Sequence, residues 1–192
     1  MRRLLNRKSN KSPLLYFSKS MIITLTGFMG VGKSTVASRL ANHLYCNCAD
    51  LDTLIEQGEG MLVEEIFSKR GEGEFRKLEE TYLENLIAKC KDKVLVVSLG
   101  GGALLSHKNR FAITENTFCI YLKASTDTIT NRLAKAHKSR PLVKDKSEDE
   151  LRKEVERLFK EREPGYESAA KLIVNVDNIS VREILSTIMD SI

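Results

Sequence analysis

Apolar and polar positions follow two alternating patterns from residue 21 to the end of the chain. Short apolar runs that favour β-strands take turns with longer segments in which apolar residues recur at helical spacing. This alternation predicts an α/β fold, with helices layered on a mainly parallel sheet. The strands expected from the pattern are residues 22–26, 44–50, 94–99, 118–122 and 172–176.

Helical patterns are clearest in four segments. One follows Gly32, and a second, over residues 74–89, carries a stripe of apolar residues that we interpret as core. A Ser-x-x-Glu capping box predicts a charged helix that begins at Ser147 and ends at Arg162. A second capping box at Ser180 predicts the last helix of the chain.

Length and composition suit a single globular domain. The chain has 192 residues, of which 42% are hydrophobic and 30% charged, and this is enough to enclose one core. No apolar run approaches the roughly 20 residues that a membrane-spanning helix needs. We therefore expect no membrane partner.

The net charge of +5 is concentrated in the first 20 residues. This segment holds six Lys and Arg residues and no acidic residue, which leaves a net charge of −1 for residues 21–192. We therefore expect residues 1–20 to form a basic tail and residues 21–192 to form the folded domain. No basic surface is expected behind the tail, so we expect no nucleic-acid partner.

The tail itself is open to three interpretations. It lacks the apolar core of a signal peptide. Translation could begin at Met21, or residues 1–20 could be a disordered arm or part of a transit peptide. The expected location is the cytoplasm, with a plastid as the alternative if the tail belongs to a transit peptide.

The four cysteines are not spaced like a metal site. Cys46 and Cys48 fall on one face of a predicted strand, Cys119 lies in another strand, and the three histidines are scattered. We interpret the cysteines as small buried apolar side chains of a protein from a reducing compartment.

The strongest chemical signal is a phosphate-binding loop between the first strand and the first helix. Gly27–Ser34 fits the pattern G-x-x-x-x-G-K-[ST] at every fixed position. Its glycines let backbone N–H groups converge on phosphate oxygens, and the helix N-terminus adds a positive dipole end. Lys33 supplies a charge for the β- and γ-phosphates, and the Ser34 hydroxyl can bind magnesium. The loop predicts nucleotide binding but does not define the reaction.

Two carboxylates follow the second predicted strand. Alternation along the strand sends Asp50 and Asp52 toward the same side, at the carboxyl edge where ligands bind in open α/β sheets. One could hold magnesium through water, and the other could accept a proton from a substrate hydroxyl. The structural alternative for Asp52 is a helix N-cap.

Three glycines, Gly100–Gly102, follow the third strand. Such a run is costly to order unless another group approaches the backbone closely, although a plain turn is the alternative. No acidic residue ends this strand, so a magnesium role would fall elsewhere, on Asp50.

Three arginines stand next to helix starts or breaks. Arg76 follows two glycines, and Arg162 precedes Pro164. Arg140 lies in the polar segment 136–146, which is the best candidate for a mobile lid. Each arginine alone could be a solvated surface charge. Phosphoryl transfer needs cations, and an anionic substrate is best held by forked guanidinium groups.

Taken together, these motifs resemble the shikimate kinase family along nearly all of residues 21–190. The resemblance rests on six pieces, which occur in the family's order: residues 27–35, Asp50–Glu56, Gly73–Glu80, Gly100–Gly102, Arg140–Leu142 and Arg162–Tyr166.

The resemblance implies a three-layer α/β P-loop kinase fold with a five-stranded parallel sheet of order 2-3-1-4-5 and a mobile lid. It implies that the protein phosphorylates the 3-hydroxyl of shikimate with ATP, giving 3-phosphoshikimate and ADP. This reaction belongs to the pathway to chorismate and the aromatic amino acids. The implied cofactor is Mg²⁺, and we expect a monomer.

Residue roles follow by motif position. The implied ATP-binding residues are Gly30, Val31, Gly32, Lys33, Ser34, Thr35, Arg132 and Arg140. The implied shikimate-binding residues are Asp52, Arg76, Gly101, Gly102 and Arg162. Lys33, Asp52 and Arg140 are the expected catalytic residues, with Asp52 as the base, and Ser34 and Asp50 are the expected metal ligands.

Two departures from the family pattern affect these roles. The third strand ends in Ser98-Leu99 where the family often has Ala-Thr, so one hydroxyl near the phosphates is shifted by a residue. Arg132 is the nearest match to the arginine that packs on adenine, but its spacing to Arg140 varies in the family.

Two rival functions remain open. Another small-metabolite kinase, such as a gluconate kinase, would share the phosphate loop but not the glycine turn with paired arginines. A catalytically silent binding protein would keep the fold. The presence of Lys33, Asp52 and Arg140 together argues against the second rival, because loss of one of them would be its expected mark.

Overall fold

The sheet of this protein has five parallel strands. The structure is a computed structural model that describes residues 20–90, 93–135 and 147–192. Its strand order, β2-β3-β1-β4-β5, is the order implied by the family resemblance. The strands are β1 (Met21–Thr26), β2 (Asn47–Asp50), β3 (Val94–Ser98), β4 (Phe118–Lys123) and β5 (Leu172–Asn175).

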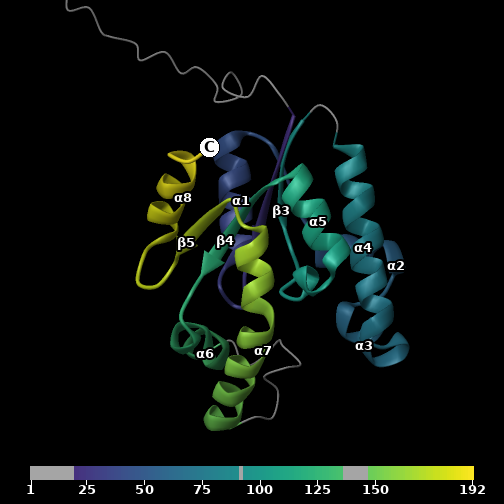
Figure 1. The fold of residues 1–192 in the computed structure, drawn as a ribbon, viewed down its shortest axis with the longest axis vertical. Coiled ribbons are helices and arrows are strands. Elements are labelled where there is room, and N and C mark those ends of the chain that lie inside the picture. Colours follow the sequence, from purple (N-terminus) through teal and green to yellow (C-terminus); the bar gives the residue numbers. More distant parts are fainter. Residues whose placement is uncertain (1–19, 91–92, 136–146) are drawn as a thin grey trace, which may run out of the picture.

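Helices cover both faces of the sheet, which makes the predicted three layers (Figure 1). Helices α1 and α8 contact each other and the sheet, while α5 and α7 contact each other and β4. The pair α2 and α3 packs on α4. The helices are α1 (Lys33–Leu44), α2 (Leu51–Glu59), α3 (Val63–Arg70), α4 (Glu72–Lys89), the short η2 (Ala103–Leu105), α5 (His107–Asn116), α6 (Thr126–Lys135), α7 (Glu148–Ala169) and α8 (Val181–Met189).

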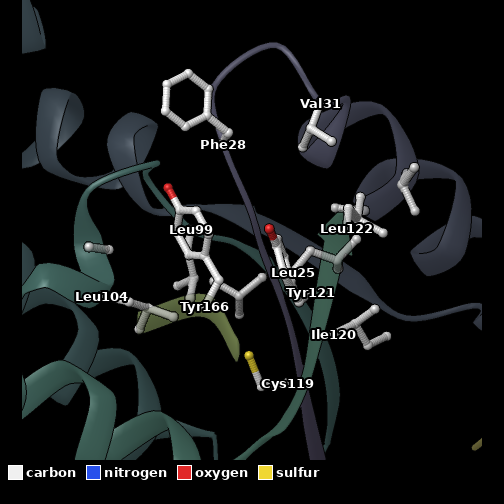
Figure 2. Close-up of a cluster of buried hydrophobic side chains, with 14 of the residues drawn as sticks. Leu25, Phe28, Val31, Leu99, Leu104, Cys119, Ile120, Tyr121, Leu122 and Tyr166 are labelled. Carbon is white, nitrogen blue, oxygen red and sulfur yellow. The ribbon is translucent and has the colours of Figure 1, made fainter. Parts of the chain in front are cut away.

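The core lies around the central strand β1. Ile23 and Leu25 are fully buried between β3 and β4, as expected for a strand covered on both faces. The buried cluster continues upward into the phosphate loop, where Phe28 and Val31 face the ends of the strands (Figure 2). The loop is therefore anchored in the core by its own side chains.

The second strand is shorter than the pattern predicts. Helix α1 continues to Leu44, and Tyr45 then takes a left-handed conformation with φ 53°. Its N–H donates to the carbonyls of Ala41 and Asn42, which closes the helix. The apolar residues at 44–46 therefore end a helix, and β2 begins only at Asn47.

The charged helix is longer than predicted. The capping box at Ser147 is confirmed, but α7 continues past Arg162 and through Pro164 to Ala169. Proline inside a helix removes one backbone hydrogen bond, yet the helix persists because its buried face continues beyond it. Arg162 and Tyr166, one turn apart, therefore point to the same side. The capping box at Ser180 is also confirmed, as the start of α8.

The interpretation of the cysteines as buried holds only for Cys119. Cys48 is exposed because β2 is an edge strand, and Cys46 and Cys90 are half-buried. Among the described residues, no group of three or more His, Cys, Asp or Glu side chains could hold a metal ion. No helix in the described ranges has the length and apolar character needed to cross a membrane. The predicted mobile loop, 136–146, lies outside the described residues.

Candidate active site

The phosphate loop connects β1 to α1 at the carboxyl end of the sheet. Gly32 has a φ of 105°, which favours glycine, and it is the N-cap residue of α1 without a capping side chain. The N-terminus of α1 thus has no side-chain cap, as is common at sites where a helix N-terminus binds an anion. The Lys33 ammonium bends back over the loop and donates to the carbonyls of Gly27, at 2.9 Å, and Phe28, at 3.1 Å.

A cavity of about 540 Å³ opens above this loop. The loop, the end of β2, the start of α2 and the segment after β3 all contribute to it. Its lining brings together eight of the residues expected at the site: Gly30, Gly32, Lys33, Ser34, Thr35, Asp50, Asp52 and Gly101. Val31 is buried beneath the loop instead.

Three oxygen-bearing side chains meet on one wall of the cavity. The Ser34 hydroxyl donates to Asp50 at 2.9 Å and lies 3.3 Å from the Ser98 hydroxyl. Oxygen donors of this kind suit Mg²⁺, which commonly uses one or two carboxylates together with waters and substrate phosphates. The shifted hydroxyl of Ser98 therefore joins the two expected metal ligands.

Asp52 lies in the first turn of α2, not in the strand. Asp50 is the N-cap residue, and its carboxylate accepts a hydrogen bond from the Asp52 N–H at 3.2 Å. The N-cap alternative for Asp52 was therefore wrong, and its carboxyl is left for the cavity. Burial, followed by the charge of Asp50, raises the pKa of Asp52. A raised pKa makes this carboxylate a better proton acceptor.

The glycine turn after β3 is crowded by charged side chains. A Cβ atom at Gly100 would lie 2.7 Å from an Asp52 oxygen, and one at Gly102 would lie 2.5 Å from an Arg76 nitrogen. These approaches are closer than a side chain tolerates. The close-approach interpretation is therefore confirmed for Gly100 and Gly102, whereas Gly101 has only ordinary contacts and the segment is also a hydrogen-bonded turn.

Arg76 approaches the turn from α4. Its guanidinium forms ion pairs with Glu72, at 2.8 Å, and with Glu79. The rings of Phe67 and Phe75 lie 5.8 and 5.4 Å from the guanidinium carbon. Carboxylates and aromatic rings thus fix the direction in which Arg76 presents its charge.

Arg162 approaches the same turn from α7. It is 9% exposed, and its Nε atom has no hydrogen-bond partner in the described part of the chain. Its guanidinium carbon lies 5.8 Å from the centre of the Phe28 ring. One helical turn later, the Tyr166 hydroxyl donates to the Gly101 carbonyl. Helix α7 thus contributes a cation and a support for the turn.

A model of the shikimate kinase family matches residues 29–192 of the chain. The chain belongs to the shikimate kinase family. A shikimate kinase of Chlorobium phaeobacteroides is 43% identical over 154 residues, which cover 77% of this chain and 78% of that protein. A shikimate kinase of Bacillus subtilis is 35% identical and covers 88% of both chains.

Solved structures of this family share the fold. The shikimate kinase of Acinetobacter baumannii, solved in complex with shikimate, has a TM-score of 0.83 and 30% identity, and the match covers 93% of this chain and 96% of that one. The shikimate kinase of Bacteroides thetaiotaomicron has a TM-score of 0.81 and 28% identity over 89% and 97% of the two chains.

Two arginines of the family pattern are not found in the cavity lining: Arg132 lies apart from it, and Arg140 lies outside the described residues. Arg132, on α6, donates to the carbonyls of Val31 at 3.0 Å and Val176 at 3.3 Å. It therefore supports the back of the phosphate loop, and its packing on adenine stays a prediction. Arg140 lies outside the described residues, so its role as the lid arginine also stays a prediction.

Glu79 is the site residue to which sequence reasoning gave no role. It occurs in the family motif, but nothing in its local sequence separates it from Glu80. The structure buries it to 1% exposure, between Arg76 and Asp52, with one oxygen lacking a partner. Burial raises its pKa to about 7, although Arg76 acts in the opposite direction.

Proposed function

We propose that this protein transfers the γ-phosphoryl group of ATP to the 3-hydroxyl of shikimate, giving 3-phosphoshikimate and ADP. The chain's membership of the shikimate kinase family and its likeness to a family structure containing shikimate support this reaction. The observation that carries the acceptor assignment is the convergence of Arg76 and Arg162 on the glycine turn beside Asp52. Two cations and one carboxylate suit a hydroxylated carboxylic acid.

Asp52 is the proposed base. Its carboxyl lies at the junction between the phosphate side of the cavity and the glycine turn. Burial raises its pKa, so the carboxylate accepts a proton more readily than an exposed one as the acceptor hydroxyl attacks phosphorus. The proton passes from the hydroxyl to the Asp52 oxygen while the new O–P bond forms.

Arg76 and Arg162 are the proposed clamp for the carboxylate of shikimate. They flank Gly101 and Gly102, whose lack of side chains leaves room for a ring to lie against the backbone. Arg76 is already paired with acidic residues, whereas Arg162 is buried with an unpartnered Nε. An incoming carboxylate would supply the missing acceptor.

The phosphate groups of ATP are proposed to lie on the loop from Gly30 to Thr35. Backbone N–H groups and the Lys33 ammonium would hold the transferred group in line with the acceptor. Arg132 and Arg140 complete the proposed ATP-binding set, with Arg140 as the third catalytic residue beside Lys33 and Asp52.

Ser34 and Asp50 are the proposed ligands of Mg²⁺, and Asp50 would bind through water. The oxygen donors at 2.9 and 3.3 Å around the Ser34 hydroxyl support this assignment. When bound, the ion neutralises charge on the phosphate oxygens. Ser34 and Asp50 would hold the ion beside the phosphate loop.

A single chain is proposed to suffice, because every residue assigned to the site belongs to one protomer. We also propose that ATP and shikimate bind without a nucleic-acid partner. A cytoplasmic location remains the proposal. The plastid alternative has no support, since the relatives are bacterial.

A steady-state assay with separate acceptors tests the proposed function. Purified protein with ATP and Mg²⁺ should consume ATP when shikimate is added and should show little turnover with gluconate. Turnover with gluconate but not with shikimate would reject the assignment in favour of the rival small-metabolite kinase. No turnover with either acceptor would favour the silent binding protein.

A further inference from the structure

We propose that Phe28 is a positioning residue for the acceptor: its ring orients Arg162 and links that orientation to the phosphate loop. The inference rests on the proposed role of Arg162 in binding the carboxylate of shikimate. It assigns a task to a loop residue at one of the variable positions of the phosphate-loop pattern.

The contact between the Phe28 ring and Arg162 is the first support. The guanidinium carbon lies 5.8 Å from the ring centre, within the range in which a cation is attracted to an aromatic face. Both side chains are largely buried, at 1% and 9% exposure, so water weakens this attraction little. The ring therefore restricts the plane in which Arg162 presents its donors.

The two arginines of the clamp are fixed by different means. Arg76 has carboxylate partners in Glu72 and Glu79. Arg162 forms no ion pair among the residues that the structure describes; it interacts with the Tyr166 hydroxyl and, at longer range, with Glu79, and its Nε lacks a partner. An aromatic face orients a cation without neutralising it, so Arg162 keeps its charge for an incoming anion.

Phe28 is held against α7 by a second ring. Phe159 lies 6.0 Å from Phe28 between ring centres and is three residues before Arg162 on the same helix. Residues three apart on a helix are neighbours on its surface. Helix α7 therefore presents both an apolar ring and a cation to Phe28, which sets the distance between the helix and the loop.

The backbone of Phe28 belongs to the nucleotide side of the site. Its carbonyl accepts hydrogen bonds from the Lys33 ammonium, at 3.1 Å, and from the Val31 N–H, at 3.3 Å. A nucleotide that engages Lys33 and the loop N–H groups changes these contacts. Phe28 thus links the backbone of the loop to Arg162 through its ring. Figure 2 shows this ring at the loop end of the core.

A coupling between the two substrates follows. If nucleotide binding fixes the position of the Phe28 ring, and the ring fixes the orientation of the Arg162 guanidinium, then bound nucleotide should strengthen the binding of shikimate. By linkage, shikimate should strengthen nucleotide binding by the same factor. Without the ring, this factor should approach one.

The test uses Phe28→Leu, which keeps an apolar side chain but removes the aromatic face. The KM for shikimate should rise about five- to twentyfold, as expected for loss of a buried cation–π contact. Titrations of shikimate with and without ADP should show that the coupling factor falls toward one. Phe111→Leu is the matched control, because it makes the same change at an exposed ring of α5, and its shikimate KM should change less than about twofold.

The methyl ester of shikimate separates positioning from packing. The ester lacks the negative charge that Arg162 is proposed to bind, so Phe28→Leu and the unmodified protein should bind it alike. Equal losses for shikimate and its ester would overturn the inference and make Phe28 a packing residue. An unchanged shikimate affinity and coupling factor in Phe28→Leu would also overturn it.

Arg162→Ala distinguishes failure of this inference from failure of the proposed function. If Arg162→Ala raises the shikimate KM strongly while Phe28→Leu does not, the clamp stands and the role of Phe28 is rejected. If Arg162→Ala leaves the shikimate KM unchanged, the clamp itself is wrong, and the inference falls with it.

Discussion

Two carboxyl groups stand on the acceptor side of the site: Asp52, which is partly buried, and Glu79, which is buried. Burial raises the pKa of both, but their surroundings differ. Asp52 faces the cavity and the phosphate loop, where a proton acceptor is needed. Glu79 is enclosed behind the glycine turn and pairs with Arg76. The carboxyl of Asp52 is therefore suited to proton transfer, and that of Glu79 is suited to positioning the Arg76 guanidinium.

Replacement of Asp52 by Asn tests the role of the base. Loss of a positioned general base commonly lowers turnover by about 100-fold or more, so kcat should fall by at least that factor. The neutral amide avoids a buried charge, so the melting temperature should not drop, and ATP affinity should stay within about twofold. Stopped or coupled kinetics and nucleotide titration measure these quantities. Retention of more than a tenth of the activity would show that Asp52 is not essential.

The raised pKa of Glu79 predicts a pH-dependent stability. The folded protein binds this proton more tightly than the unfolded chain, whose carboxyl has a pKa of 4.5. The contribution of Glu79 to the free energy of unfolding should therefore be largest below pH 4.5 and should decrease as the pH rises to about 7. The total decrease should be about 3 kcal/mol at most. Urea unfolding of the unmodified protein and Glu79→Gln across this range tests it. Two parallel stability curves would contradict the assignment.

At the scale of elements, the site depends on a turn held from three sides. Tyr166 of α7 donates to the Gly101 carbonyl, and Arg110 of α5 donates to the carbonyls of Leu104 and Leu105. Asn109 of α5 donates to the Ala103 carbonyl at 3.0 Å. Helices α5 and α7 thus fix the segment after β3, while α4 brings Arg76 against it.

Gly102→Ala tests this close packing. The added methyl would lie 2.5 Å from the Arg76 guanidinium, which is the movable end of a long side chain. Arg76 should therefore shift and lose its charged hydrogen bonds, including the one to buried Glu79, which raises the shikimate KM about tenfold or more and lowers the stability. Gly73→Ala, on α4 with open space around it, is the control and should leave the KM unchanged. Equal KM values for both variants would refute the packing argument.

The sequence predicts an element well when the residues that determine it lie close together in the chain. The phosphate loop is contiguous, so its residues and its flanking strand and helix could be read directly. Alternation placed Asp50 and Asp52 on the correct edge, although Asp52 reaches the cavity because a helix begins at Leu51. Tyr45 ended the first helix through a left-handed turn that hydrophobicity does not reveal.

Contacts between distant residues could not be predicted in this way. Pro164 indicated a helix end near Arg162, but tertiary packing carries α7 to Ala169. The burial of Glu79 and the stacking of Phe28 on Arg162 arise only when α4, α7 and the loop converge. No periodicity within a single segment encodes them.

At the scale of the whole molecule, the parallel sheet gathers one site from distant parts of the chain. The phosphate loop follows β1, Asp50 ends β2, and the glycine turn follows β3. Helices α4 and α7 add the two arginines beside that turn. One side of this edge is therefore suited to nucleotide phosphates and the other to an anionic acceptor.

Direct identification of the product is the sharpest test of the proposed separation between a nucleotide side and an acceptor side of the site. Purified protein should be incubated with shikimate, ATP and Mg²⁺, and the product examined by phosphorus and proton NMR. We expect one phosphate ester on the 3-hydroxyl of shikimate, formed together with one ADP. Hydrolysis of ATP without a phosphorylated shikimate, or an ester on a different hydroxyl, would contradict the proposed geometry of Asp52, Arg76 and Arg162.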